Sequence, residues 1–173
     1  MESTFAGEKM GEKPIEIQLK AISLNYLEAP IEVREKLTFD ESQTKSLLIH
    51  LKDVLGIGEA LVLSTCNRTE IYFNHAASAK KVFKVVSAFR GLESAGIEQY
   101  FQFFTESEKT IRHIFRVAIG LESQILGDLQ IINQVKNAYQ WCADLEMAGT
   151  FLHRLLHTIF FANKRGVQET ELR

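Results

Sequence analysis

The chain has 173 residues, of which 46% are hydrophobic, so it is long enough for one well-cored domain and too short for three. Its 20 lysines and arginines against 22 acidic residues give a formal charge of -2, which lacks the electrostatic footprint of an autonomous nucleic-acid binder. The two cysteines have no paired spacing, which argues against a zinc site or redox dithiol and favours a reducing, cytoplasmic setting.

The opening residues, 1–13, are polar and lack the apolar core of a signal peptide or a membrane span. We expect them to be a disordered tail or an expression remnant, followed by a single domain over residues 14–173. Apolar residues then occupy every second position up to Ala21. From Ile22 the alternation continues, but with the apolar residues on the other set of positions. This pattern predicts a first strand with a bulge near Ala21.

Two helices are predicted between this strand and the centre of the chain. Pro30 stands where a helix can begin, and residues 31–37 place apolar side chains on one face of a short helix. A longer helix follows, with Thr38 and Glu41 spaced as a capping box. Its apolar stripe consists of Leu47, Leu48, Leu51, Val54 and Leu55.

Gly56 and Gly58 follow the longer helix and are expected to end it. They do not complete a dinucleotide-binding fingerprint, because its third glycine position is Leu61 and a strand follows where a helix should begin. No other stretch offers a better nucleotide loop. We therefore do not expect this sequence to bind a dinucleotide tightly.

Residues 61–73 are the stretch around which the chain is organised. Three consecutive apolar residues are followed by a group of polar residues. From Glu70 to Phe73, polar and apolar side chains then alternate. This pattern predicts a buried strand, a tight polar connection and a half-buried strand, with Cys66 held at the break.

Cys66 is the first candidate for chemistry, because rigid scaffolds often place reactive groups at strand ends. A nearby cation such as Arg68 would lower the pKa of the Cys66 thiol toward the nucleophilic thiolate. Thr65, Asn67 and Arg68 could donate hydrogen bonds to a bound carboxylate or carbonyl. The alternative is that Cys66 is one more buried small hydrophobe, as free cysteines often are.

The second half of the chain is predicted to be mostly helical. Residues 79–89 predict an amphipathic helix, residues 100–104 a last strand, and three helical segments follow, the first of them ended by Gly120 or Gly127. Cys142 shares the apolar face of the second segment and is assigned to the core. These elements predict an α+β domain, with a small, mainly antiparallel sheet of about four strands covered by helices and a helical C-terminal part.

The residues from Ser64 to Tyr72, Ser-Thr-Cys-Asn-Arg-Thr-Glu-Ile-Tyr, resemble the active-site signature of the glutamyl-tRNA reductases. Two further stretches, 24–37 and 113–134, resemble the same family in the same order and at plausible spacing. The resemblance runs from about Lys20 to Arg173. It covers the family's N-terminal catalytic domain and not the whole enzyme.

In that family an NADPH-binding domain and a helical dimerisation domain follow the catalytic domain. The resemblance implies that both are absent from this chain, so NADPH would serve the full-length enzyme and would not be bound by this fragment. It also implies a homodimer only with the missing C-terminal domain. Glutamyl-tRNA is the implied partner, and no membrane is involved.

The implied chemistry is a two-step reduction by an NADPH-dependent oxidoreductase of tetrapyrrole biosynthesis. The Cys66 thiolate attacks the ester that joins glutamate to tRNA and forms a thioester, which NADPH then reduces to glutamate-1-semialdehyde. Sulfur suits both steps, because a thiolate attacks well at neutral pH and a thioester is a better hydride acceptor than an oxygen ester. This fragment alone would be limited to thioester formation or ester hydrolysis.

His113 matches a histidine that the family places near the cysteine, which makes it the second candidate catalytic residue; the alternative is a helix histidine that packs or meets water. The positions that match the family's substrate contacts are Thr65, Asn67, Arg68, Ser123, Asp128, Leu129, Gln130 and Gln134. Asp128-Leu129-Gln130 stands where the family usually reads Glu-Pro-Gln. Tyr26 stands where the family usually has a histidine.

Arg68 is the expected cation for the carboxylate of the glutamyl side chain, and Glu70 is expected to orient Arg68 or a backbone donor. Two other functions stay open at this point. The chain could be a non-catalytic relative that binds tRNA or a protein partner. It could also be another acyl transferase or hydrolase that uses Cys66 and His113.

Overall fold

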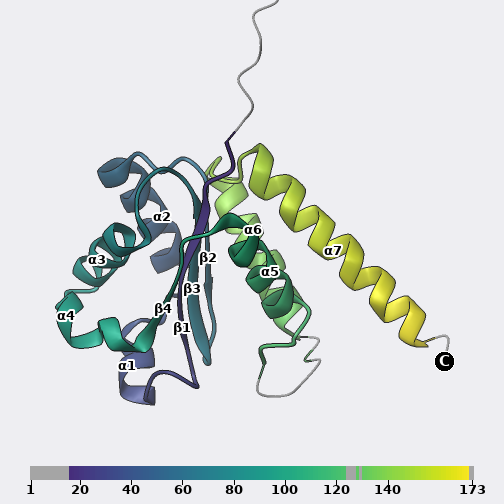
Figure 1. Cartoon of the computed structure of the whole chain (residues 1–173), viewed down its shortest axis with the longest axis horizontal. Coiled ribbons are helices and arrows are strands. Elements are labelled where there is room, and N and C mark those ends of the chain that lie inside the picture. Colours follow the sequence, from purple (N-terminus) through teal and green to yellow (C-terminus); the bar gives the residue numbers. More distant parts are fainter. Residues whose placement is uncertain (1–15, 124–127, 129, 172–173) are drawn as a thin grey trace, which may run out of the picture.

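Within residues 16–123, 128 and 130–171, which the computed structural model describes, four strands form one antiparallel sheet in the order β2-β3-β1-β4 (Figure 1). The strands are β1 (Leu19–Asn25), β2 (Ala60–Ser64), β3 (Arg68–Asn74) and β4 (Phe101–Phe104). The helices are α1 (Ile31–Lys36), α2 (Glu41–Leu55), α3 (Ala79–Phe89), α4 (Ser94–Ile97), α5 (Ser107–Ala118), α6 (Gln130–Asp144) and α7 (Thr150–Glu171). A 3₁₀ turn over Glu98–Tyr100 leads into β4. The predicted α+β class is confirmed, whereas the predicted tail over residues 1–13 lies outside the described residues.

Helices cover both faces of the sheet, with α2 and α3 on one side and α5 and α6 on the other (Figure 1). This arrangement corrects two predictions. Strand β3 was expected to be half-buried, but every residue from Arg68 to Phe73 is buried. The bulge in β1 was also wrong, because Ala21 pairs with Tyr72 and Ile22 with Ile71 in one continuous register. The change of phase in β1 reflects burial of both faces, so no extra residue is needed to explain it.

The predicted hairpin at the centre of the chain is confirmed. Strand β2 pairs antiparallel with β3, and the three residues between them, 65–67, carry Cys66 at the tip. Strand β1 lies along the other edge of β3, so that Asn25 stands opposite Arg68. The end of β1, and with it Tyr26, is thereby brought to the same end of the sheet as Cys66.

The start of helix α2 differs from the predicted capping box of Thr38 and Glu41. Asp40 caps the helix, since its Oδ1 accepts from the Gln43 backbone N–H at 2.8 Å and the Gln43 Oε1 accepts from the Asp40 backbone N–H at 3.0 Å. The Thr38 hydroxyl instead donates to the Arg34 carbonyl at 2.9 Å, where α1 ends. The sequence therefore predicted the correct type of helix cap, but placed it two residues too early.

Gly56 ends α2 as predicted, with a φ of 71° that L side chains rarely adopt. Replacing Gly56 with alanine should lower the free energy of unfolding by about 1–2 kcal/mol, which is the backbone cost of that conformation, because no heavy atom lies within 4 Å of the added Cβ. Urea unfolding measures the loss. Gly58→Ala is the matched control, since Gly58 also faces open space without a positive φ. An equal loss in both variants would contradict this account of Gly56.

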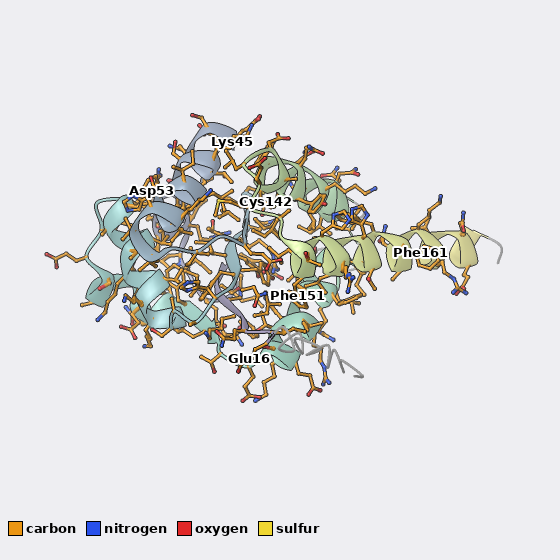
Figure 2. All side chains as sticks on the ribbon, turned by 90° about the horizontal axis from the view of Figure 1, so that it is seen from above. Glu16, Lys45, Asp53, Cys142, Phe151 and Phe161 are labelled. Carbon is orange, nitrogen blue, oxygen red and sulfur yellow. The ribbon has the colours of Figure 1, made fainter. Side chains whose placement is uncertain are left out.

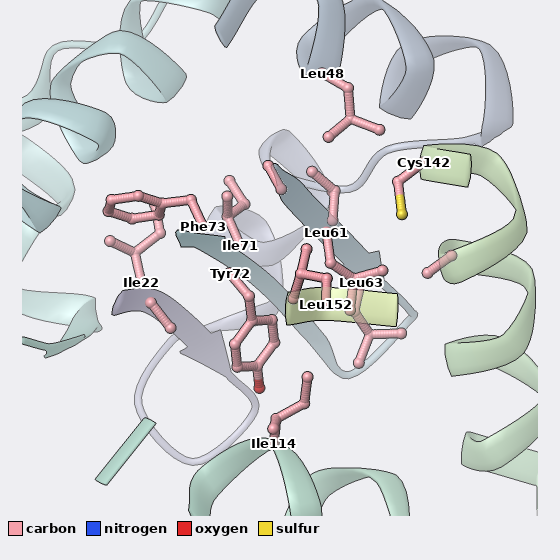
Figure 3. Packing of buried hydrophobic residues seen from close by; sticks show 14 of the residues in the cluster. Ile22, Leu48, Leu61, Leu63, Ile71, Tyr72, Phe73, Ile114, Cys142 and Leu152 are labelled. Carbon is pink, nitrogen blue, oxygen red and sulfur yellow. The ribbon is translucent and has the colours of Figure 1, made fainter. Parts of the chain in front are cut away.

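The helices after β4 complete the core on the second face of the sheet. The α6 side chains Ile131, Val135, Ala138 and Cys142 are buried, and Cys142 belongs to the same apolar cluster as Leu48, Leu61 and Leu152 (Figure 3). Helix α7 starts against this cluster and then extends beyond the rest of the domain, where Phe161 is 65% exposed (Figure 2). None of the helices in the described part of the chain is both long and apolar enough to span a bilayer.

Candidate functional site

The connection that carries Cys66 is held by the backbone and by one hydroxyl. The Thr65 N–H donates to the Arg68 carbonyl at 2.8 Å, and the Thr65 Oγ1 accepts from the N–H groups of Asn67 and Arg68, each at 3.2 Å. Both acceptor positions of this hydroxyl are therefore used within the turn. Among the described residues no acceptor takes its own proton, which leaves that proton for the oxygen of a ligand.

The base of the hairpin is tied to the segment between α1 and α2. The Thr69 hydroxyl donates to the Leu37 carbonyl at 2.8 Å, and the Ser64 Oγ accepts from the Phe39 N–H at 2.9 Å. Ser64 and Thr69 are also 3.1 Å apart through their hydroxyl oxygens. These bonds hold both strand ends in place, so the position of Cys66 is set by rigid elements on either side of it.

A cavity of about 160 Å³ opens beside Cys66, whose side chain is exposed. It is lined by Tyr26, Thr65, Cys66, Asn67, Arg68, Ser123, Asp128, Gln130, Ile131 and Gln134. The structure thus brings together the nucleophile candidate and all of the implied substrate contacts except Leu129, which lies outside the described residues. Sequence reasoning missed Tyr26 and Ile131 as lining residues. The signal that could have found Tyr26 was its place directly after the first predicted strand, at a position where the resemblance notes a departure.

Asp128 has a local structural partner as well as a place in the cavity wall. Its Oδ1 accepts from the Gln130 backbone N–H at 2.9 Å, at the first residue of α6. A carboxylate in this position stabilises a helix start. Asp128 therefore places an acidic side chain in the cavity wall, fixed by the helix that it precedes.

The guanidinium of Arg68 is fixed by hydrogen bonds to other residues of the domain. Only 5% exposed, it donates through Nη1 to Glu70 Oε1 at 2.8 Å, and Nη2 donates to the carbonyl oxygen of Glu122. The predicted contact between Glu70 and Arg68 is therefore present. A guanidinium carries five N–H donors in a planar fork, so these two bonds fix its orientation and leave donors for the cavity.

Glu70 is the centre of a buried polar cluster, which we call the Glu70 cluster and define as Ser23, Arg68, Glu70, Tyr72 and His113. Its Oε1 accepts from the Ser23 hydroxyl at 2.9 Å and lies 3.0 Å from His113 Nε2, and its Oε2 accepts from the Tyr72 hydroxyl. Figure 3 shows the Tyr72 ring extending from β3 toward α5.

The charge state of Glu70 follows from these contacts. Burial alone would raise the pKa of this fully buried carboxyl, but the hydrogen bond and charge of His113, the charge of Arg68 and the Tyr72 hydroxyl together lower it from 4.5 to about 2. Burial and the adjacent Glu70 carboxylate raise the pKa of Tyr72. Glu70 is therefore a carboxylate and Tyr72 a neutral donor at physiological pH.

His113 is not among the residues that line the Cys66 cavity. It stacks on Phe104 with ring centroids 4.2 Å apart, and it lines a separate hollow of about 320 Å³ that also includes Asn25 and Gln102. Arg68 lines both hollows. The structure thus joins His113 to the cysteine site through Glu70 and Arg68, a connection that the sequence did not reveal.

The two cysteines differ sharply in their surroundings. Cys142 is fully buried, donates to the Tyr139 carbonyl at 3.1 Å, and has its pKa raised to about 12, chiefly by burial. We expect iodoacetamide to alkylate Cys66 in the native protein and both thiols only after unfolding. Mass spectrometry of the digested protein measures this. Native alkylation of Cys142 at a similar rate would contradict the assignment of that thiol to the core.

Fold and site together define a thiol-bearing α+β domain, in which an exposed cysteine on a hairpin turn faces a small polar cavity backed by a buried ion pair. The chain belongs to the family described as "Glutamyl-tRNAGlu reductase, N-terminal domain", whose model matches residues 22–170.

Individual relatives agree with this assignment. The chain is 49% identical over 158 residues to the glutamyl-tRNA reductase of Cytophaga hutchinsonii and 38% identical over 152 residues to that of Methylococcus capsulatus, matches that cover 89% and 87% of this chain. The structure of the glutamyl-tRNA reductase from Methanopyrus kandleri matches 89% of the chain with a TM-score of 0.71 and 27% identity. The aligned parts make up 37%, 36% and 35% of these proteins, so the chain spans little more than a third of their length.

Proposed function

We propose that this chain is the domain of a glutamyl-tRNA reductase that accepts the glutamyl group on Cys66. The thiolate sulfur forms a bond to the ester carbonyl carbon, and the bond from that carbon to the ribose oxygen breaks. The released oxygen takes a proton from water, which balances the proton lost when the thiol ionised, and tRNA leaves with a free hydroxyl. The product is a thioester on Cys66. The observation that carries this proposal is the exposed Cys66 thiol beside a cavity lined by the residues of the family signature.

The cavity offers suitable partners for a glutamyl group. Arg68 is its cation, and we propose that the donors left over from Glu70 and Glu122 bind the carboxylate of the glutamyl side chain. Thr65 has one hydroxyl proton left for a carbonyl or carboxylate oxygen. Asn67, Ser123 and Gln134 add neutral donors and acceptors around the thiol.

We assign His113 the role of a positioning residue. Its Nε2 contacts Glu70, and Glu70 in turn holds Arg68, so the imidazole acts on the substrate through two intermediate side chains. The alternative of a cysteine–histidine acyl transferase requires the imidazole within hydrogen-bond reach of the thiol. The placement of His113 in a separate hollow argues against that alternative.

NADPH is the hydride donor implied by the family, and it would reduce the thioester to glutamate-1-semialdehyde for tetrapyrrole synthesis in the longer protein. Gly56 and Gly58 do not fit a site for it. They connect helix α2 to strand β2, whereas a dinucleotide phosphate loop connects a strand to a helix. We therefore assign no described residue of this chain to the cofactor.

Glutamate transfer from labelled glutamyl-tRNA tests the proposal directly. The protein is mixed with the charged tRNA without NADPH and quenched in acid, after which released tRNA and the mass of the peptide containing Cys66 are both measured. We expect deacylation together with a glutamyl adduct on that peptide. Binding of the tRNA without deacylation would favour a non-catalytic binding domain. Equal deacylation of unrelated aminoacyl-tRNAs would favour a general acyl hydrolase.

A further inference from the structure

Two histidines on α7 converge on a tyrosine of α6, on a surface that the proposed function does not use. His153 and His157 are exposed and lie one helical turn apart, so their side chains share a face of α7. Their rings are 4.2 Å apart between centroids. The Tyr139 hydroxyl oxygen lies 2.6 Å from His153 Nδ1 and 3.4 Å from His157 Nε2.

Hydrogen bonding within this trio depends on the imidazole tautomers, because the phenol oxygen can also accept from a ring nitrogen that carries a proton. A phenol has one proton, so Tyr139 can donate to only one of the two imidazole nitrogens that face it. The contact of 3.4 Å to His157 is long for a hydrogen bond. Each histidine therefore turns one ring nitrogen toward the phenol oxygen, and the contact of His157 is the weaker of the two.

We propose that His153 and His157, with the Tyr139 hydroxyl beside them, form a binding site for a divalent first-row transition metal ion such as Zn²⁺. Neutral imidazole is the most common protein ligand for these ions and suits zinc, copper and nickel. Histidines at positions i and i+4 of a helix can both reach one ion, as in helical zinc motifs. Water would complete the coordination, because no three histidine, cysteine or acidic side chains of the described residues are placed so that they could hold a metal ion together.

The distances are compatible with such an ion. Tetrahedral zinc with bonds of about 2.0–2.1 Å separates its ligand atoms by about 3.3 Å. The Tyr139 oxygen lies 2.6 and 3.4 Å from the two nitrogens, on either side of that value, and exposed histidine side chains can turn to adjust these separations.

The consequence would be a connection between two helices. Tyr139 belongs to α6, which packs on the sheet, and the histidines belong to α7, which extends away from the sheet (Figure 1). A bound ion would fasten α7 to α6 near Phe160, whose ring contacts both Tyr139 and His157 edge-on. The inference stands apart from the proposed function, because it uses neither Cys66 nor its cavity.

Zinc binding by the whole chain tests the site. Free Zn²⁺ is titrated against a chromophoric chelator, and the wild type should take up one equivalent that persists in Cys66→Ser, since an exposed thiol could also bind zinc. His153→Ala and His157→Ala should each weaken this equivalent at least about 10-fold. His50→Ala is the matched control, since His50 is a histidine of α2 that contacts Phe89.

A second measurement separates the site from scattered surface binding. Zinc should raise the melting temperature of the wild type and of His50→Ala, and should leave that of the His153→Ala/His157→Ala variant unchanged. Circular dichroism establishes that each variant is folded before the titration. The proposal is overturned if the single histidine variants bind zinc as tightly as the wild type, or if the equivalent disappears in Cys66→Ser.

Discussion

Replacing Cys66 with serine should abolish the glutamyl adduct and slow deacylation of glutamyl-tRNA by at least about 10³-fold. The hydroxyl of serine is a far weaker nucleophile at neutral pH, and the described contacts of this turn place no general base on it. Because Cys66 is exposed, the change should leave the fold and its stability nearly unaltered. Quenched-flow deacylation and mass spectrometry measure the two effects.

Cys142→Ala serves as the control for this experiment. That thiol lies in the apolar cluster of α6 and the sheet, so its loss should reduce stability and leave the adduct on Cys66 intact. If Cys66→Ser still deacylates glutamyl-tRNA at the wild-type rate, Cys66 is not the nucleophile. If Cys142→Ala loses the adduct while remaining folded, the assignment of the two thiols is wrong.

The fold was predictable where one local pattern allowed one structure. The apolar run before Cys66 and the alternation after it predicted the hairpin, and helical spacing placed Cys142 in the core. The bulge near Ala21 was wrong because a change of phase is also what a strand with two buried faces produces. A sequence does not show how many layers cover a strand, so it could not separate the two explanations.

The sequence indicated candidate residues for the site, but it did not indicate how they are arranged in space. Residues 65–68 of the signature and the described positions on the helical side line one cavity, whereas their role as substrate contacts stays a prediction. The alternation of Glu70 and Tyr72 with apolar neighbours suggested two solvent-facing side chains. Both are in fact fully buried, because each satisfies the other and His113 approaches from a distant helix. Partners that are far apart in sequence leave no local signal.

Glu70 also explains why the site can contain a buried arginine. Removing Arg68 from water is costly unless a counter-charge and hydrogen bonds replace the solvent. The Glu70 carboxylate supplies the charge, and the Glu122 carbonyl supplies a second acceptor. The remaining members of the Glu70 cluster occupy the carboxylate's other acceptor positions. Orientation of the cation in the cavity therefore depends on residues that the substrate does not touch.

Replacing Glu70 with glutamine should cost about 3–5 kcal/mol of stability at pH 7, the largest stability effect that we expect from a single substitution in this chain. The amide keeps the size of the side chain, but it leaves the Arg68 charge buried without a counter-ion. Urea unfolding followed by circular dichroism measures the loss. Glu106→Gln is the control, because its pair with Lys109 is mostly exposed and should contribute little.

The dependence of this effect on pH distinguishes a lost charge from lost packing. The folded protein keeps the pKa of Glu70 at about 2, whereas the unfolded chain takes up the proton near the ordinary value of 4.5. The unfolded state therefore binds more protons between these values. The contribution of Glu70 is fully present above about pH 5 and is lost as the pH falls toward 2, a change on the order of 3 kcal/mol.

Glu70→Gln lacks this titration, so its stability should fall less steeply than that of the wild type between pH 5 and pH 2, and the two curves should converge at the acidic end. A constant difference across that range would indicate that packing, and not the carboxylate charge, accounts for the loss. Tyr72→Phe supplies an intermediate case, because it removes one hydrogen bond and keeps the ion pair. We expect it to cost about 1–2 kcal/mol and to keep most, but not all, of the wild-type slope, since loss of the Tyr72 hydroxyl raises the pKa of Glu70 while the Arg68 and His113 contacts still favour the ionised carboxylate.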